Sequence, residues 1–417
     1  MTKNNRRRQL NNLRELAAQV FLKFYHLKKT THKAWNDVWP HPFFYSKKIL
    51  PDVLQPTITS LWQNFGDFIR LKFPDFNLLV VTEPESCRGI LLSEKVEKTV
   101  DRGITHTIGS YLNPNVLTSE DSISKDYHQH YITIVNQAVK NKAEFAKKII
   151  DLHIENIPTG DVDLVPYFRK IAFHLALWLL FDIKNIDLIN DENDYKVMLA
   201  FYDAVDLIQQ RYLTRKKELD DKILYLKKIV EERLKYWGVN VADKFTMPNQ
   251  VIILQNAGFE TTAATLSWST YYLSQFPELQ ISDENILTGV MNEALRLHTP
   301  VHIISRTVKE DFILNNHFYK KGDVVLINIA GMQHHQKYWE NPTSFDIKRN
   351  FNSKAYMPFA IGARGCLGTM QARFVIPNVL SALIKKFQIT GLEEKEPSTI
   401  ESFTVKPSQC RCHLIKK

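Results

Sequence analysis

The segment FAIGARGCLG, from Phe359 to Gly368, decides how this chain is interpreted. It surrounds one cysteine, Cys366, with Gly362, Gly365 and Gly368. Glycine permits positive φ angles or close backbone approach, so such a loop can direct several backbone N–H groups at one sulfur. That arrangement stabilises a thiolate that binds a metal. The segment therefore predicts a thiolate metal site at Cys366; the alternative is a surface turn that happens to contain a cysteine.

The same segment matches the pattern F-x-x-G-x-R-x-C-x-G throughout and resembles the haem-binding signature of the cytochrome P-450 superfamily, the haem-thiolate monooxygenases. Ala372 fits its extended form, C-x-G-x-x-x-A. The resemblance implies that Cys366 is the proximal ligand of haem iron, where a thiolate favours cleavage of the O–O bond. Arg364 would pair with a haem propionate and Phe359 would keep water from the sulfur. Two glycines of the loop complete the predicted haem contacts here: Gly362 and Gly368.

The composition predicts a single large, mainly helical domain. The 417 residues include only 14 glycines, no Pro/Ser/Gly-rich linker and long stretches of 3.6-residue periodicity. We expect residues 1–45 to be a basic N-terminal segment packed on the domain, and residues 46–417 to be the catalytic domain. The resemblance implies a cytochrome P-450-like fold, with a long central helix over the haem and small β-sheets.

The N-terminal segment predicts a basic amphipathic helix with Leu13, Leu16, Val20 and Phe24 on one face. Packing on the domain is the expected role of that face, and contact with an anionic membrane surface is the alternative. The sequence contains no run of 18 apolar residues, so we expect no membrane span. The four cysteines form neither a disulfide framework nor a zinc spacing. Free thiols suit a reducing compartment, so we expect a cytoplasmic protein.

The net charge of +9 raises the question of an acidic partner. Nucleic acid is one candidate, but no nucleic-acid-binding motif is present, so we expect none. The resemblance instead implies an electron donor of the ferredoxin or flavodoxin type that docks on the basic face carrying the cysteine loop. Its electrons would come indirectly from NAD(P)H. Ordinary solvated helix faces are the alternative explanation for these charges.

Sequence periodicity and turn signals predict the main elements. Strands are expected at 68–73 and 78–81, followed by a helix that Thr82 caps. Consecutive helices are expected from about 126 to 238, one of them running on from Gln137. A long helix should span about 248–275 with Thr246 as its cap, and a second should span about 283–298. The short connection between these two helices resembles soluble bacterial members of the superfamily.

The long helix contains AGFETT, residues 257–262. Ala257 and Gly258 leave space for a flat macrocycle, and a following hydroxyl can bond back to the carbonyl four residues earlier. The hexapeptide resembles the oxygen-activation pattern of the superfamily, [AG]-G-x-[DE]-T-[TS]. In that reading Thr261 holds a water beside the reacting oxygen, and Glu260 relays protons to it from solvent. The alternative is a helix with a chance glycine and an exposed glutamate.

The next helix carries Glu293 and Arg296 in the segment NEALRLHTP. E-x-x-R alone is common on helices, but this segment resembles E-x-L-R-L-x-x-P of the superfamily. Arg349 matches the arginine that completes the family's Glu-Arg-Arg network. We expect a buried structural network that supports the cysteine loop.

The remaining haem contacts are less clearly marked. Arg306 stands where the family often has a second propionate partner, although a surface arginine would fit equally. Many soluble members read H-x-x-x-R in the helix near 126–136, whereas this chain has His128 followed by Ile132. His128 is therefore a candidate without its usual cation, and His130 and Tyr131 are possible substitutes.

Together these motifs predict a monooxygenase that inserts one atom of O2 into an apolar small molecule, with haem b as cofactor. The alternatives are a haem-thiolate isomerase, dehydratase or peroxygenase that uses no external electrons, and a non-catalytic haem sensor. The acid–threonine pair argues against the first group, since such enzymes often lack it. No motif names the substrate.

Overall fold

Helices form most of the described chain. The computed structural model describes residues 36–38, 58–59, 61–73, 76–101, 103–184, 186–214, 216–392, 396–400 and 404–417. The predicted N-terminal helix and the predicted boundary between residues 45 and 46 lie outside these residues. The helices are α4 (Pro84–Leu92), α5 (Gly103–Leu112), α6 (Asp121–Asn141), α7 (Ala143–Glu155), α8 (Val165–Phe181), α9 (Glu192–Thr214), α10 (Glu218–Tyr236), α11 (Pro248–Gln275), α12 (Glu284–Leu297), α13 (Ile329–Gln333) and α14 (Thr369–Lys386).

The strands form one larger sheet and three small ones. The six-stranded sheet has the order β1-β2-β3-β9-β6-β4, and the small sheets are β10-β13-β5, β11-β12 and β7-β8. The strands are β1 (Asn36–Val38), β2 (Phe68–Lys72), β3 (Asn77–Val81), β4 (Val96–Lys98), β5 (Gly160–Asp163), β6 (Ile303–Val308), β7 (Phe312–Leu314), β8 (His317–Tyr319), β9 (Val324–Asn328), β10 (Phe387–Gly391), β11 (Thr399–Ile400), β12 (Lys406–Pro407) and β13 (Arg411–Lys416).

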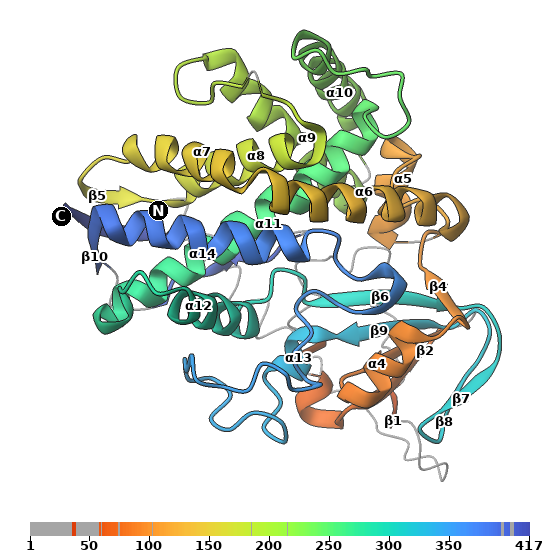
Figure 1. Cartoon of the computed structure of the whole chain (residues 1–417). Coiled ribbons are helices and arrows are strands. Elements are labelled where there is room, and N and C mark those ends of the chain that lie inside the picture. Colours follow the sequence, from red (N-terminus) through yellow and green to blue (C-terminus); the bar gives the residue numbers. More distant parts are fainter. Residues whose placement is uncertain are drawn as a thin grey trace, which may run out of the picture.

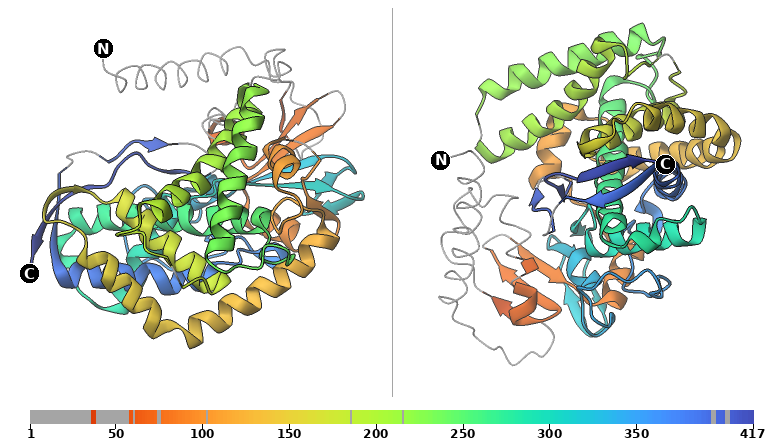
Figure 2. Two further views of the ribbon diagram at one scale, coloured as in Figure 1. Left: turned by 90° about the horizontal axis from the view of Figure 1, so that it is seen from above. Right: turned by 90° about the vertical axis from the view of Figure 1, so that its left-hand side faces the viewer.

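The helices gather on one side of the molecule and the six-stranded sheet lies on the other (Figure 1). The long helix α11 crosses the helical side, with α9 and α10 lying over it (Figure 2). Its residues are buried almost all round because it also packs against α8, α12 and α14. The loop before α14, which carries Cys366, lies at the boundary between the helices and the sheet (Figure 1).

The predicted helix over 248–275 is confirmed, but its predicted cap is wrong. Pro248 opens α11, where its missing N–H costs nothing, and Met247 is the cap residue. The Thr246 hydroxyl instead donates to the Asn240 carbonyl at 2.6 Å. Likewise Glu83, not Thr82, caps α4 by accepting from the amides of the next turn. Both threonines have their hydroxyls engaged elsewhere, since Thr82 accepts from Asn328.

The prediction of one continuous helix starting at Gln137 is also wrong, because α6 ends and α7 begins at Lys142. Nothing local forces this break. Lys142 reaches across to α8, where its ammonium lies 2.6 Å from Asp182 and 4.9 Å from the centre of the Trp178 ring. A contact between segments far apart in sequence thus coincides with the helix boundary. No helix in the described part of the chain is both long and apolar enough to cross a bilayer.

A buried histidine pair joins α7 to α8 and predicts acid sensitivity. His153 Nε2 and His174 Nδ1 are 3.0 Å apart. Burial lowers the pKa of His174 to about 4 and, with added repulsion from His174, that of His153 to about 3. The unfolded chain protonates first, near pH 6.5, so this stability is present above pH 6.5 and declines as pH falls toward 4. The expected loss is about 1.4 kcal/mol per pH unit for each histidine.

Urea unfolding between pH 7 and pH 4.5 measures that slope. The double variant His153→Leu with His174→Leu should show a shallower slope, since the two apolar side chains remove both titrating groups. His413→Gln is the control, because His413 is exposed and paired with Asp161. An unchanged slope in the double variant would place the acid sensitivity elsewhere.

Candidate active site

The cysteine loop is closed by its own backbone. The Cys366 amide donates to the Phe359 carbonyl at 2.8 Å, and the Gly365 amide donates to the Gly362 carbonyl at 2.9 Å. Gly362 has φ of 80°, and a Cβ there would meet the Leu91 carbonyl oxygen of α4 at 2.9 Å. Glycine is therefore required at this position. Gly365 and Gly368 have negative φ, so only one of the three glycines supplies positive φ.

The Cys366 side chain is exposed, yet protein atoms surround its sulfur. Burial raises the pKa of the Cys366 thiol, and hydrogen bonds from the Gly368 amide and the Thr369 side chain act in the opposite direction. A sulfur that is both uncovered and surrounded lies in a recess rather than on an open face. Gly368 lies beside the sulfur, since a Cβ there would be 3.8 Å from Cys366 Sγ. Coordination to a metal would deprotonate such a thiol outright.

Helix α11 has one uncovered strip, formed by Ala257, Gly258 and Thr261. Ala257 is exposed and the other two are half-buried, whereas nearly all residues from 250 to 274 are buried. Thr261 lies next to both of the others on the helix surface, because it follows them by four and three residues. A Cβ on Gly258 would lie 3.6 Å from Ala176 of α8, an ordinary contact, so packing against α8 does not require glycine here. The strip leaves room for a flat group against the helix.

Hydroxyls bond back along the helix at this strip, as predicted. Thr261 Oγ1 donates to the Ala257 carbonyl at 2.6 Å, and Thr262 Oγ1 donates to the Gly258 carbonyl at 2.6 Å. Such back-bonding loosens a helix locally. Thr261 therefore has a hydroxyl held at the uncovered strip, with its oxygen still able to accept a further hydrogen bond.

Glu260 lies beside this strip and is buried in an ion-pair cluster. Its carboxylate accepts from Arg169 of α8 at 2.9 and 3.2 Å, and from Lys406 of β12 at 2.5 Å. Both cations also lie over the Tyr202 ring of α9, at 4.8 and 4.6 Å from its centre. The alternative, a helix with a chance glycine and an exposed glutamate, is thus wrong about the exposure of Glu260. Arg169 and Lys406 were missed because no local motif marks them.

A pocket borders this cluster on the side of α9. It contains about 340 Å³ of empty space, part of it open to solvent. Its walls are formed by Tyr202, Val205, Asp206, Gln209, Asn256, Glu260, Thr404 and Lys406. Glu260 therefore has solvent within reach on one side and the uncovered strip of α11 on the other.

The predicted Glu-Arg-Arg network is present and buried. Glu293 accepts from Arg296 at 2.7 Å and from Arg349 at 2.9 Å, and both Glu293 and Arg296 are fully buried. The two arginines also donate to backbone carbonyls between residues 333 and 344. Nearby, the Tyr356 hydroxyl donates to Asn292 of α12 at 3.0 Å. Helix α12 thereby holds the segment that leads into the cysteine loop.

Arg306 of β6 is a buried cation close to that loop. It is only 6% exposed, burial lowers its pKa to about 10, and its Nε finds no partner among the described residues. A buried guanidinium with an unused donor is costly unless an anion completes it. Since Arg364 of the loop lies on the same side, the site suits a group with carboxylates. Haem carries two, so the residues present fit haem.

The candidates on α6 lie elsewhere. His128 Nε2 is 3.1 Å from the Gly365 carbonyl, so this nitrogen binds the backbone of the cysteine loop. His130 stacks on Phe245 with ring centres 3.6 Å apart, and the Tyr131 hydroxyl donates to the Phe245 carbonyl. The structure therefore does not bring His130 or Tyr131 to Arg306. A propionate role for His128 stays a prediction.

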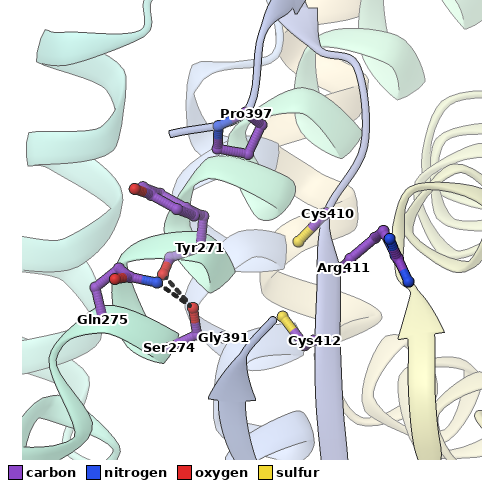
Figure 3. A pocket seen from close by; sticks show the side chains of 8 residues that line it. All are labelled: Tyr271, Ser274, Gln275, Gly391, Pro397, Cys410, Arg411 and Cys412. Atoms are coloured by element: carbon purple, nitrogen blue, oxygen red, sulfur yellow. Dashed lines mark hydrogen bonds between the residues drawn. The ribbon is translucent and has the colours of Figure 1, made fainter. Parts of the chain in front are cut away.

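The remaining thiols take no part in this site. The four cysteines are free, and Cys87, Cys410 and Cys412 are buried. The last two line a separate pocket at the carboxyl end of α11, and both sulfurs point into it (Figure 3). That end of the helix lies beyond Ser267, whose carbonyl accepts from Cys410. This pocket is therefore apart from the strip at residues 257–261.

A mainly helical fold with a recessed cysteine before α14, and an uncovered strip on a long helix, has the features that the resemblance to haem-thiolate proteins led us to expect. Comparisons with known proteins agree. The family model described as "Cytochrome P-450" matches residues 281–412. This carboxyl-terminal part of the chain matches the cytochrome P-450 superfamily, and the predicted mainly α fold is confirmed.

The individual relatives are distant. The cytochrome P-450 monooxygenase alnD of Emericella nidulans is 29% identical over 197 residues, 40% of this chain and 35% of that protein. Cytochrome P-450 6B4 of Papilio glaucus is 28% identical over 255 residues, 51% of this chain and 50% of that protein. The matches thus span half or less of these curated relatives. Among solved structures, CYP175A1 of Thermus thermophilus has a TM-score of 0.74, covering 91% of this chain and 99% of its own at 18% identity, a likeness of fold.

Proposed function

We propose that this protein is a haem-thiolate monooxygenase that inserts one oxygen atom from O2 into an apolar organic substrate. Haem b, held by Cys366, would supply the activation of O2. The observation that carries the proposal is the exposed Cys366 side chain in a loop closed by the bond from its own amide to the Phe359 carbonyl, with Gly368 beside the sulfur. The uncovered strip of α11 supports it, since it presents Thr261 where a proton-requiring reaction could use it.

Two residues of this chain would handle protons. Thr261 Oγ1 holds a water at the uncovered strip by accepting its hydrogen bond. Glu260 is the acid between that strip and the solvent-bordering pocket, and Arg169 and Lys406 keep its carboxylate in place. To pass a proton inward, Glu260 has to exchange one of these partners for water. The ion pairs therefore set how readily the relay operates.

The electron donor would dock where the cysteine loop meets the surface. Lys125 of α6 and Arg373 of α14 are exposed on the two helices that border the loop. Met370, 47% exposed, gives this face an apolar contact. These features support an acidic ferredoxin or flavodoxin-type donor, supplied by NAD(P)H. The four free thiols support a cytoplasmic location, and residues 46–417 would form the catalytic domain.

Carbon monoxide tests the proposal directly. The purified protein is loaded with haem, reduced and exposed to carbon monoxide. Thiolate ligation by Cys366 predicts the red-shifted Soret band typical of this coordination. If fully loaded protein shows only the band of a neutral ligand, the proposal fails. Substrate turnover with peroxide alone, and none with a reductase and NAD(P)H, would favour a peroxygenase or isomerase instead.

Thr261→Ala should uncouple electron use from product formation. Product per NAD(P)H is expected to fall by about tenfold or more while hydrogen peroxide release rises, because the hydroxyl that positions the proton donor is lost. Thr262→Ala is a matched control, since Thr262 makes the same back-bond but is buried, at 6% exposed. Equal coupling in the two variants would remove Thr261 from the mechanism.

A further inference from the structure

The six-stranded sheet ends in an unusual pairing of two cations. Strands β4 and β6 are antiparallel, and Lys98 lies directly opposite Arg306. Side chains in such a pair project on the same face of the sheet within about 5 Å of each other. Like charges placed this way repel, and here Arg306 is buried. The fold accepts a repulsive pair at this edge, beside the cysteine loop.

A third cation completes the cluster. The charges of Arg364, in the cysteine loop, and Arg306 both act on Lys98 and, after burial, lower its pKa to about 7. The described groups that act on Lys98 are thus both positive. The negative charge of Glu97 acts on Arg364. Glu97 precedes Lys98 in β4, so the two side chains project from opposite faces of the strand. The cluster of Lys98, Arg306 and Arg364 therefore carries excess positive charge.

The hydrogen bonds of Lys98 leave one position open. Its ammonium donates to the Val116 carbonyl at 2.5 Å and to the Ser124 hydroxyl. An ammonium has three N–H groups, so one donor remains. Ser124 lies in the first turn of α6, the helix in which the expected arginine is missing at position 132. Lys98, on β4, thus connects α6 to the cation cluster.

We propose that Lys98 is a haem-propionate ligand of this chain, acting with Arg306 and Arg364 in place of the arginine absent from α6. This inference rests on the proposed haem-thiolate function. The cluster offers an unused donor on Lys98 and an unused Nε on Arg306, and its three cations outnumber Glu97, the carboxylate that acts on Arg364. A carboxylate at this position would relieve the repulsion and fill both donors.

The test measures how fast ferric holoprotein loses haem to an excess of a haem-scavenging apoglobin. Lys98→Met should lose haem about ten- to a hundredfold faster, the effect of losing one charge-assisted hydrogen bond. Lys98→Arg should stay within about threefold of the wild type. Lys95→Met is the matched control, because Lys95 precedes the same strand but is exposed and paired with Glu310 at 3.4 Å. Its haem loss should not change.

A second measurement separates propionate binding from damage to the fold. Haem dimethyl ester, which lacks both carboxylates, should leave the wild type and Lys98→Met at equal rates. The Lys98→Met apoprotein should be as stable as the wild type or more so. Its substitution removes a repulsive charge, and the Val116 carbonyl keeps the Ser124 hydroxyl as donor at 2.9 Å.

Three results would overturn the assignment: unchanged haem loss in Lys98→Met, equally accelerated loss of the dimethyl ester, or a less stable apoprotein. The carbon monoxide band is recorded for each variant. It should persist in Lys98→Met, since Cys366 is untouched. Its absence from the wild type would refute the proposed function, whereas its presence with unchanged haem loss would refute only the role of Lys98.

Discussion

Cys366→Ser is expected to abolish the red-shifted carbon monoxide band and to lower turnover by more than about a hundredfold. Loss of an outer partner of a metal ligand already costs roughly 10–100-fold, and here the ligand itself changes. Serine keeps the size of the side chain, and its hydroxyl remains protonated at neutral pH. The Cys366 side chain is exposed, so the apoprotein should fold as before.

Cys412→Ser is the control for that experiment. Cys412 is 1% exposed and lines the pocket at the far end of α11 (Figure 3). The control should retain the carbon monoxide band and its turnover, even if burial of a hydroxyl lowers its stability. A band that survives in Cys366→Ser, or disappears in Cys412→Ser, would contradict the assignment of Cys366 as the ligand.

Glu293→Gln should lower the free energy of unfolding by about 3–5 kcal/mol, the cost of leaving buried cations without their counter-charge. The variant keeps the shape of the side chain but removes the negative charge. Arg296, which is fully buried, and Arg349, which is nearly so, then lack their counter-charge. Urea unfolding of the apoprotein measures the change. Haem loading should fall as well, because α12 holds the segment that leads into the cysteine loop.

The control for Glu293→Gln is Glu85→Gln. Glu85 pairs with Lys354 at the surface, with both side chains more than half exposed. Pairs of this kind contribute about 0–1 kcal/mol, so its unfolding should hardly change. A comparable loss in the two variants would mean that the burial of the Glu-Arg-Arg network carries no special cost.

The motifs that could be recognised in the chain are those in which a short backbone stretch does the chemistry. Around Cys366, the loop is closed by hydrogen bonds between its own residues, so a short stretch of sequence was informative. The same holds for Thr261, whose back-bond joins residues four apart on one helix. The partners of Glu293 were also expected, because the segments that carry Arg296 and Arg349 resemble those of the superfamily.

Contacts between distant segments were not predictable in this way. Arg169 and Lys406 reach Glu260 from positions 91 residues before and 146 residues after it. Lys98 meets Arg306 only because β4 pairs with β6. Helix ends belong here too: the break at Lys142 coincides with contacts to α8, and the caps of α4 and α11 depend on which hydroxyls are already engaged.

The order of residues in this chain thus specified a thiolate loop, an acid–threonine helix and a mainly helical architecture, because each depends on interactions within a few turns of backbone. Only the folded molecule decided which charges surround them. Strand pairing and helix packing bring Lys98 and Arg364 to Arg306, and bring Arg169 and Lys406 to Glu260. Electrostatic effects depend on distance in space and on burial, and neither is written in the spacing of residues along a chain.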